Sequence, residues 1–205
     1  MAPGGIPDII ISRLPFYLRA LARMAGDGQC ITSSKELGER LGISSAQIRK
    51  DLSHFGEFGK QGTGYEVEYL LDQLQQILGV NREWEVALVG AGDLGHALAH
   101  YQGFRHRGFQ ISLIFDTDPA KIGQALGGLE ILDEAFMIPT LRQRDVRLAM
   151  LAVPAGAAQS ATDKLVEAGV RGILNYAPTS LSVPEGVRVQ HIDPVVNLQR
   201  MTYYL

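Results

Sequence analysis

An apolar run that ends in a glycine-rich turn constrains this chain more than any other part of its sequence. Residues 86–95 read Val-Ala-Leu-Val-Gly-Ala-Gly-Asp-Leu-Gly and end in the pattern G-x-G-x-x-G. In a dinucleotide-binding fold the run is a buried strand, and the three glycines allow a tight turn, the approach of a pyrophosphate and close helix packing. The run begins only after 85 residues, so a separate N-terminal domain has to be explained as well.

The composition is that of an ordinary globular protein. The chain has 205 residues, 46% hydrophobic and 20% charged, a length that suits one large or two small domains. No apolar run reaches the roughly 20 residues of a membrane span, and the N-terminus lacks the basic segment and cleavage site of a signal peptide. Cys30 is the only cysteine, which excludes an internal disulfide and a cysteine-based zinc site. We therefore expect a cytoplasmic protein that does not contact membranes.

The charge distribution excludes a strongly basic domain. Residues 1–82 carry nine Lys and Arg against nine Asp and Glu, and residues 83–205 carry ten against thirteen. Binding to nucleic acid would therefore depend on locally placed side chains rather than on an overall positive field.

The first eighty residues alternate between helical spacing and glycine-rich turns. Apolar residues at helical spacing predict amphipathic helices over residues 8–25 and 66–78. Residues 56–65 are rich in glycine and resemble the tip of a β-hairpin. A hairpin that follows short helices is typical of the wing of a winged-helix DNA-binding domain.

Two consecutive capping patterns indicate a helix-turn-helix. Ser33 precedes Glu36 by three residues, and Ser44 precedes Gln47 by three, so that each pair can cap the start of a helix reciprocally. A single tight turn containing glycine separates the two helices, as in a helix-turn-helix. The second helix, residues 44–54, would then be the recognition helix that enters the major groove of DNA.

The recognition helix and the hairpin carry polar side chains suited to base edges and phosphates. We expect contacts with DNA from Ser45, Gln47, Arg49, Lys50 and Ser53 on the helix and from Lys60 and Gln61 on the hairpin. The alternative is a small helical domain that binds another protein and leaves Arg49 and Lys50 in solvent.

Strands and helices alternate after the glycine motif. The predicted strands are residues 85–89, 111–116, 147–153, 171–175 and 187–192, and the predicted helices are residues 94–101 and 155–168. Such alternation predicts a parallel, doubly wound sheet that binds its ligand at the carboxyl ends of the strands. The residues expected to contact the cofactor are Gly90, Ala91, Gly92, Asp93, Leu94, Gly95, Val153, Pro154, Asn175 and Ala177.

Asp116 ends the second of these strands, where an acidic residue accepts hydrogen bonds from the ribose hydroxyls of a dinucleotide. Asp116 and Asp118 would repel a 2′-phosphate, which favours NAD(H) over NADP(H). Alternatively, Asp116 only caps a helix that starts at Pro119. Asp93, inside the glycine motif, either directs its charge toward the pyrophosphate or turns to solvent, and the sequence leaves both open.

The sequence offers no arrangement of residues for catalysing hydride transfer. His96 and His100 share a helix face without a third metal ligand, and His191 and Asp193 have the spacing of an ordinary strand edge. No Tyr-x-x-x-Lys occurs and no segment remains for a substrate domain, so we expect no enzyme. Two alternatives stay open: an NAD-dependent oxidoreductase with an appended DNA-binding module, and a winged-helix regulator that senses another nucleotide such as coenzyme A, against which Asp116 argues.

The last twelve residues are so apolar that we expect another protein surface to bury them. Pro194 suits the first turn of a helix, and an apolar stripe follows at Val195, Leu198, Met201, Thr202 and Leu205. The stripe can pack on its own domain or on a second subunit. A dimer would supply the two-fold symmetry with which winged-helix proteins bind palindromic half-sites.

The most distinctive segments are residues 47–56, 62–65, 90–95 with Tyr101, 172–178 and 191–193. With these segments the chain resembles, over nearly its whole length, the Rex family of bacterial redox-sensing transcriptional repressors. The resemblance implies a homodimer that binds a palindromic operator in double-stranded DNA when NADH is scarce and releases it when NADH binds. It also implies an α/β protein with an N-terminal winged-helix domain (1–80), a Rossmann-like doubly wound parallel sheet domain (81–192) and a C-terminal domain-swapped dimerisation helix (193–205).

The resemblance further implies a switch formed by Arg19, Tyr101 and Asp193, and it places Arg13 among the residues that contact DNA. Two residues depart from the pattern of the family. Asp93 stands where several relatives carry Arg or Asn, and Pro194 stands where a larger apolar residue usually lies near the nicotinamide. Both departures bear on cofactor affinity and on the selectivity between NADH and NAD.

Overall fold

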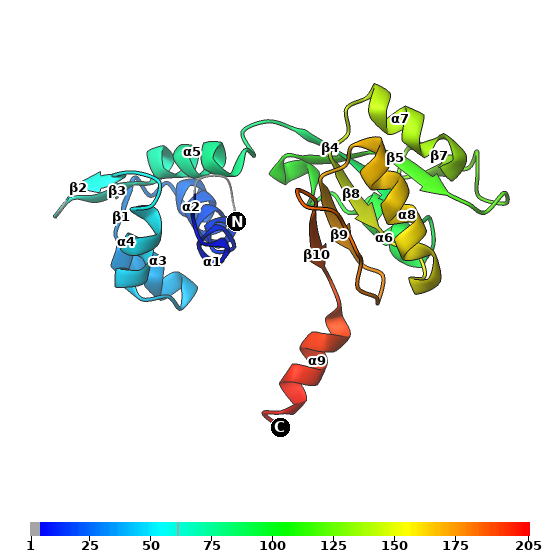
Figure 1. Cartoon of the computed structure of the whole chain (residues 1–205). Coiled ribbons are helices and arrows are strands. Elements are labelled where there is room, and N and C mark those ends of the chain that lie inside the picture. The colour runs from blue at the N-terminus through cyan, green and yellow to red at the C-terminus, as the bar shows by residue number, and fades with distance from the viewer. Residues whose placement is uncertain (1–4, 61) are drawn as a thin grey trace. The chain divides into compact units, whose positions relative to one another are not determined.

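The computed structural model describes residues 5–60 and 62–205, so the expected DNA contact Gln61 lies outside the described residues. The chain divides into two compact units, Met1–Arg82 and Glu83–Leu205. Figure 1 shows helices with a small sheet in the first unit and a larger sheet with helices in the second.

The first unit is a group of helices with a three-stranded antiparallel sheet. The buried apolar residues of α2, α3, α4 and α5 form its core. Its strands follow the order β1-β3-β2, so that β2 and β3 form the expected hairpin. Its elements are α1 (Asp8–Ile11), α2 (Leu14–Gly26), β1 (Ile31–Thr32), α3 (Ser34–Leu41), α4 (Ser45–Leu52), β2 (Gly59–Lys60), β3 (Gly64–Glu66) and α5 (Val67–Leu78).

The structure corrects the prediction of one continuous helix over residues 8–25. The segment forms α1 and α2 with a turn at Ser12 and Arg13 between them. Pro15 explains the break, because a proline has no backbone N–H to donate to the preceding turn and is tolerated only at the start of a helix.

Only one of the two hydrogen bonds expected in each capping pattern forms. The Oγ atoms of Ser33 and Ser44 accept hydrogen bonds from the backbone N–H groups of Glu36 and Gln47, as expected. The side chains of Glu36 and Gln47 do not return to the serines. They bind groups outside the cap instead: Glu36 binds Gln29, Thr32 and Arg40, and Gln47 donates to Asp51.

The second unit is built on a seven-stranded sheet with the order β10-β9-β8-β4-β5-β7-β6. Six neighbouring strands run parallel, and the order reverses direction between β4 and β8, as in a dinucleotide-binding fold. Its elements are β4 (Trp84–Val89), α6 (Asp93–His100), a 3-10 turn η1 (Arg105–Arg107), β5 (Phe109–Asp116), β6 (Ala125–Leu126), β7 (Leu129–Asp133), a 3-10 turn η2 (Glu134–Phe136), α7 (Met137–Gln143), β8 (Leu148–Leu151), α8 (Ala155–Ala168), β9 (Gly172–Asn175), β10 (Arg188–His191) and α9 (Pro194–Thr202).

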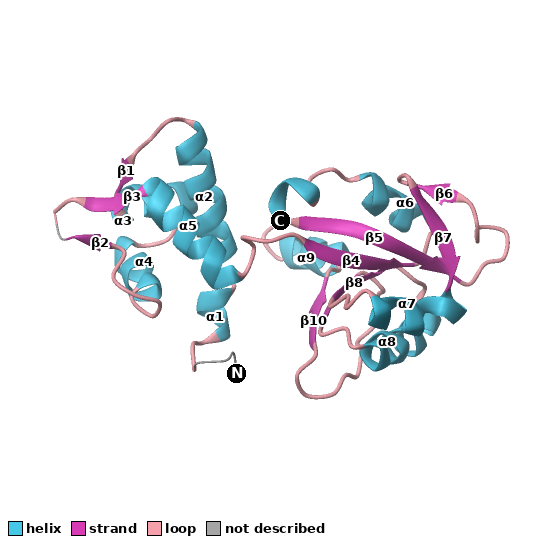
Figure 2. Cartoon of the chain, turned by 90° about the horizontal axis from the view of Figure 1, so that it is seen from above, coloured by secondary structure: helices cyan, strands magenta, loops and turns pink. Residues whose placement is uncertain are grey.

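Alternation along the strands gives the sheet two buried faces. Ala87 and Val89 of β4 join a core with α7 and α8, whereas Val86 and Leu88 join a second core with Leu98 of α6. Figure 2 shows α6 on one side of the sheet and α7 and α8 on the other. The carboxyl ends of β4, β5, β8 and β9 therefore meet at one edge that both helix layers leave open.

Two parts of this sheet differ from the expectation. The short strand β6 pairs antiparallel with β7, so the sheet is mixed rather than wholly parallel. No helix starts at Pro119, where residues 117–124 form turns and bends. The segment that contains β6, β7 and α7 was not predicted, because its apolar runs are too short for a clear period.

The terminal helix α9 lies beyond the sheet, and none of its residues is buried. Pro194 occupies its first turn, as expected, and the Asp193 carboxylate accepts a hydrogen bond of 2.9 Å from the Val195 N–H. The expected apolar stripe is exposed: Val195, Leu198, Met201 and Leu205 have relative exposures of 57%, 61%, 62% and 105%. Across the described residues, no helix combines the length and apolar character needed to cross a membrane.

Candidate functional site

The glycine motif forms a tight turn between β4 and α6. Gly90 adopts a φ of 100°, which side chains rarely allow, and its N–H donates to the Phe115 carbonyl at 2.8 Å. Gly95 is needed for a different reason: a Cβ there would lie 2.0 Å from the Gly90 oxygen. At Gly92 the space beside the backbone is open, with no atom within 4 Å of a Cβ position.

A pocket of about 520 Å³ lies next to this turn, at the carboxyl edge of the sheet. It brings together five of the residues expected to bind the cofactor: Gly90, Gly92, Asp116, Val153 and Pro154. The pocket lies where the strand order reverses, which is where open parallel sheets bind nucleotides. Lys121 and Glu134 also line it, and neither was predicted from the sequence.

The Asp116 carboxylate holds the walls of this pocket together. Its two oxygens accept backbone N–H groups of Ala91 at 2.7 Å and of Asp118 at 2.8 Å. Burial raises the pKa of Asp116, but these two N–H groups and the nearby Lys121 outweigh burial and hold the pKa below its ordinary value. The carboxylate is therefore charged at neutral pH, and it fixes the glycine turn rather than capping a helix from Pro119.

Lys121 places a positive charge in the pocket. Its Nζ lies 3.3 Å from Asp116 Oδ2 and 3.8 Å from Asp118 Oδ2. The net charge at this end of the pocket is therefore less negative than the charge of the two aspartates alone. The spacing of Asp118 and Lys121, three residues apart in a turn, is the sequence signal that could have identified the lysine.

The other residues expected to bind the cofactor lie around the pocket rather than among the residues that line it. Ala91 and Gly95 are buried behind the turn, whereas Asp93 and Leu94 are exposed on the first turn of α6. Asp93 is exposed, and either possibility, a charge directed toward the pyrophosphate or a side chain turned to solvent, stays a prediction. Tyr101 is 55% exposed and packs edge-on against Phe104 at 4.9 Å, at the end of α6.

Asn175 uses its amide inside the protein. Its Nδ2 lies 3.2 Å from the Ala177 carbonyl and 3.0 Å from His191 Nδ1, and its Oδ1 accepts the Ala177 N–H at 2.9 Å. These contacts shape the loop after β9, and a contact of Asn175 with the cofactor stays a prediction. His191 binds Asn175 while Asp193 caps α9, so the two residues do not form a pair.

In the first unit, α4 presents the polar face expected of a recognition helix. Arg49, Lys50 and Ser53 are exposed, and Ser45 and Gln47 are half-buried. The remaining hairpin candidate, Lys60, has its backbone in β2.

Arg13, which is predicted to contact DNA, forms an ion pair with a buried carboxylate. Its Nε and Nη2 donate to the two oxygens of Asp51 at 2.6 and 2.8 Å. Asp51 is fully buried in α4 and also accepts bonds from Tyr17 Oη at 2.6 Å and Gln47 Nε2 at 2.7 Å. The guanidinium of Arg13 therefore helps to fix α4 against α2, and its contact with DNA stays a prediction.

This buried network keeps Asp51 charged. Burial raises the pKa of Asp51, but the hydrogen bonds from Arg13, Tyr17 and Gln47 outweigh burial and leave the pKa below its ordinary value. Burial and the bond to Asp51 raise the pKa of Tyr17, so its hydroxyl stays protonated and donating. This network could not be predicted from a local pattern, because Tyr17 and Arg13 lie 34 and 38 residues from Asp51.

The residues expected to form a switch are divided between the two units. Arg19 lies on the exposed face of α2 with its guanidinium 5.6 Å from the centre of the Phe16 ring. Tyr101 and Asp193 belong to the second unit, where Tyr101 follows α6 and Asp193 caps α9. Within the described residues, no cluster of His, Cys, Asp or Glu is placed to hold a metal ion.

Two family models match the two units in turn. Residues 5–53 match a putative DNA-binding protein N-terminus, and residues 81–179 match a CoA binding domain. The redox-sensing transcriptional repressor Rex of Chloroflexus aurantiacus is 55% identical over 97% of this chain and 94% of its own length. The chain belongs to the Rex family. Rex of Carboxydothermus hydrogenoformans is 46% identical over 97% of this chain and 95% of its own.

Solved structures agree with membership of the Rex family. RSP in complex with β-NAD+ and operator DNA has a TM-score of 0.93 and 35% identity, over 97% of this chain and 92% of RSP. RSP in complex with β-NADH has a TM-score of 0.88 and 32% identity, over 98% of this chain and 94% of RSP. Rex proteins are named as repressors and not as enzymes, which agrees with the expectation from the sequence.

Proposed function

We propose that this chain is a cytoplasmic repressor that senses the ratio of NADH to NAD+. It binds a palindromic operator as a homodimer when NADH is scarce and leaves the operator when NADH binds. One observation carries the proposal: the chain matches RSP at a TM-score of 0.93, and that structure of RSP holds both β-NAD+ and operator DNA.

The face of α4 supports binding in the major groove. Lys50 and Ser53 project from it into solvent, and Gln47 is oriented by its bond to Asp51. A side chain that is held in place loses less entropy when it binds a base edge, which favours a defined contact. Lys60 and Gln61 are proposed to contact DNA from the hairpin, and Ser45 from the start of α4.

The pocket in the second unit fits a dinucleotide. The open space at Gly92 lets a pyrophosphate approach the backbone, and the charged Asp116 can accept the hydroxyls of the adenosine ribose. Val153 and Pro154 provide an apolar wall. The nicotinamide supplies the redox state that is sensed, while residues of this chain bind and orient the dinucleotide.

The exposed stripe of α9 supports the proposed homodimer. Its apolar side chains have no cover in their own unit, and a second copy of the chain would bury them. Binding of NADH and of DNA then oppose each other through two states of the dimer, and each ligand lowers the affinity for the other by the same factor.

The proposal is tested by binding of operator DNA while NADH, NAD+, NADPH and coenzyme A are added in turn. We expect NADH to release the DNA at the lowest concentration. Coenzyme A is the second candidate, because residues 81–179 match a CoA binding domain; release by coenzyme A alone would favour that reading. Oxidation of NADH by the protein with any acceptor would favour an oxidoreductase and contradict the proposal.

We expect Arg19→Ala and Asp193→Asn to weaken the release of DNA by NADH and to leave the stability of the fold unchanged. The Asn variant is chosen because Asn caps a helix about as well as Asp, whereas Asp193→Ala also removes the cap of α9, at about 1 kcal/mol. A gel shift titrated with NADH measures the effect. If Asp193→Asn responds like the unchanged protein and only Asp193→Ala differs, then Asp193 acts as a cap and not in a switch.

Asp116→Asn is expected to lower the affinity for NADH about tenfold, because a charged acceptor of ribose hydroxyls is lost. The affinity for NADPH should rise relative to NADH, since Lys121 is then free to meet a 2′-phosphate. Calorimetric titration of both nucleotides measures the ratio. Adding Lys121→Ala to Asp116→Asn is expected to remove the gain for NADPH, and an undiminished gain would exclude a role for Lys121.

A further inference from the structure

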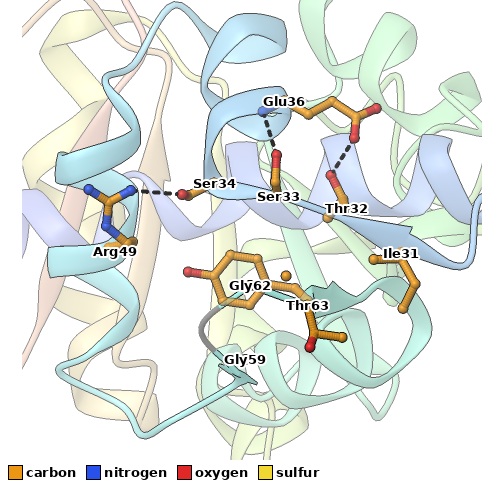
Figure 3. Close-up of a pocket in the computed structure, with 11 residues that line it drawn as sticks. Ile31, Thr32, Ser33, Ser34, Glu36, Arg49, Gly59, Gly62 and Thr63 are labelled. Carbon is orange, nitrogen blue, oxygen red and sulfur yellow. Dashed lines mark hydrogen bonds between the residues drawn. The ribbon is translucent and has the colours of Figure 1, made fainter.

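A hollow of about 830 Å³ lies in the first unit, between the start of α3, the side chain of Arg49 and the β2–β3 hairpin. Figure 3 shows this hollow with Ser33, Ser34 and Thr32 on one side and Gly59, Gly62 and Thr63 on the other. Among the described residues, it is larger than the nucleotide pocket. It belongs to the face that carries the recognition helix and the hairpin.

Arg49 supplies the positive charge of the hollow. Its Nη1 donates to the Ser34 Oγ at 3.0 Å, and Figure 3 shows the two side chains pointing toward each other. This bond holds one edge of the guanidinium against the start of α3, and Arg49 is among the residues that line the hollow. A guanidinium held beside the hollow is placed to bind an anionic oxygen that enters it, because Arg forms strong charge-assisted hydrogen bonds with phosphate.

The other groups that line the hollow suit the same kind of ligand. Thr63 is exposed and Tyr65 is half-buried. Burial raises the pKa of the Tyr65 hydroxyl and outweighs the opposing charge of Arg49, so the hydroxyl stays protonated. Hydroxyl groups of this kind donate to phosphate oxygens in complexes with DNA. Glu36 is the one acidic residue among the residues that line the hollow, and its carboxylate is bound by Gln29, Thr32 and Arg40.

The geometry of duplex DNA identifies the occupant. A major and the adjacent minor groove are separated by one sugar–phosphate strand. When α4 lies in the major groove and the hairpin reaches the minor groove, that strand has to pass between them. The hollow lies between Arg49 of α4 and the hairpin residues Gly62 and Thr63.

We infer that this hollow binds the sugar–phosphate strand of the operator, and that Arg49 binds a phosphate there instead of a base. The inference rests on the proposed function, and it assigns affinity and sequence discrimination to different residues of the DNA-binding face. Arg49, with Thr63 and Tyr65, contributes affinity that does not depend on sequence. Ser34 is a positioning residue that orients Arg49, and discrimination between bases falls to the other side chains of α4.

The test measures the affinity of the full-length protein for two duplexes over a range of salt concentrations. One duplex is selected by the protein from a randomised pool, and the other has the same composition in scrambled order. Arg49→Ala is expected to weaken binding to both duplexes by the same factor, about tenfold. The slope of log K against log salt should fall by about 0.9, the value for one lost phosphate contact.

Three further variants separate the effect of the Arg49 charge from the effect of its orientation and from a general effect of charge. Ser34→Ala should weaken both duplexes by a smaller common factor, because Arg49 loses its orienting bond but keeps its charge. Arg49→Lys should restore the salt slope, since one positive charge remains. Arg142→Ala removes the same charge from an exposed pair with Glu167 in the second unit, and it should leave both affinities and the slope unchanged.

Two outcomes would overturn the inference. If Arg49→Ala weakens only the selected duplex and leaves the salt slope unchanged, then Arg49 contacts a base. If neither duplex is affected, then the hollow lies outside the interface. Failure of the proposed function would be seen in the unchanged protein instead. That protein would then show no preference for the selected duplex or no release by NADH.

Discussion

Asp51→Ala is expected to lower the free energy of unfolding of the first unit by about 3 to 5 kcal/mol, the cost of removing one partner from a buried ion pair. Asp51 is fully buried, and its oxygens accept bonds from Arg13, Tyr17 and Gln47. Without the carboxylate, the partly buried guanidinium of Arg13 keeps its charge and loses its acceptor. Binding to operator DNA should fall as well, because the same bonds hold α4 against α2.

Hydrogen exchange measured by mass spectrometry can follow the two units separately. Peptides from α2 and α4 should lose protection in Asp51→Ala, whereas peptides from the sheet of the second unit should not. The matched control is Asp72→Ala, which removes an exposed carboxylate from α5 of the same unit. Similar protection in the two variants would show that the Asp51 network contributes little to stability.

The same network gives a dependence on pH with a defined sign. The pKa of Asp51 in the folded protein lies below its ordinary value, because the bonds from its three partners outweigh burial. Its contribution to stability is therefore fully present above the unfolded pKa of about 3.9 and is lost as the pH falls through the folded value. Asp51→Ala should show a weaker loss of stability with acid than the unchanged protein.

The second large effect is expected from a pair of glycines in the same turn. In Gly95→Ala the new Cβ would lie 2.0 Å from the Gly90 oxygen. Because the clash is with backbone, β4 and α6 have to separate, at a cost of about 3 kcal/mol or more. We expect this variant to lose both stability of the second unit and binding of NADH.

Gly92→Ala separates binding from folding. Gly92 has φ −81° and ψ −169°, which alanine adopts without strain, and no atom lies within 4 Å of the new Cβ. The second unit should therefore unfold at the same denaturant concentration, as reported by the fluorescence of the single Trp84. The methyl group fills the space through which the pyrophosphate approaches, so the affinity for NADH should fall at least about tenfold. Unchanged affinity would mean that the dinucleotide does not contact this part of the turn.

The sequence alone was sufficient to predict those parts of the fold that depend on a recognisable pattern of residues. The glycine motif, the apolar strand before it and Asp116 after the next strand predicted a nucleotide pocket at the carboxyl edge of the sheet, and the structure brings Gly90, Gly92 and Asp116 together there. The serine caps of α3 and α4 were predicted for the same reason. The caps rest on residues three positions apart, and the pocket rests on a glycine motif and an acidic strand end at a spacing typical of dinucleotide-binding folds.

The features that the sequence did not reveal depend on partners far apart in the chain. The guanidinium of Arg13, which stays a predicted DNA contact, is bound by a buried carboxylate 38 residues away. The amide of Asn175, which stays a predicted cofactor contact, lies beside His191, a residue of the neighbouring strand and 16 positions away. A sequence pattern does not show whether a polar side chain has a partner inside the protein. Such a side chain is therefore easily assigned to a ligand alone.

The exposed helix α9 has a consequence for how the protein is assembled. A helix of nine residues with no buried side chain is only marginally stable by itself in water. In the proposed homodimer, ordering of this segment and association of two chains would be a single event. The melting temperature should then rise with protein concentration, and association should show the large negative heat capacity change of coupled folding and binding. Repression would thereby depend on how many copies of the chain a cell holds as well as on its supply of NADH.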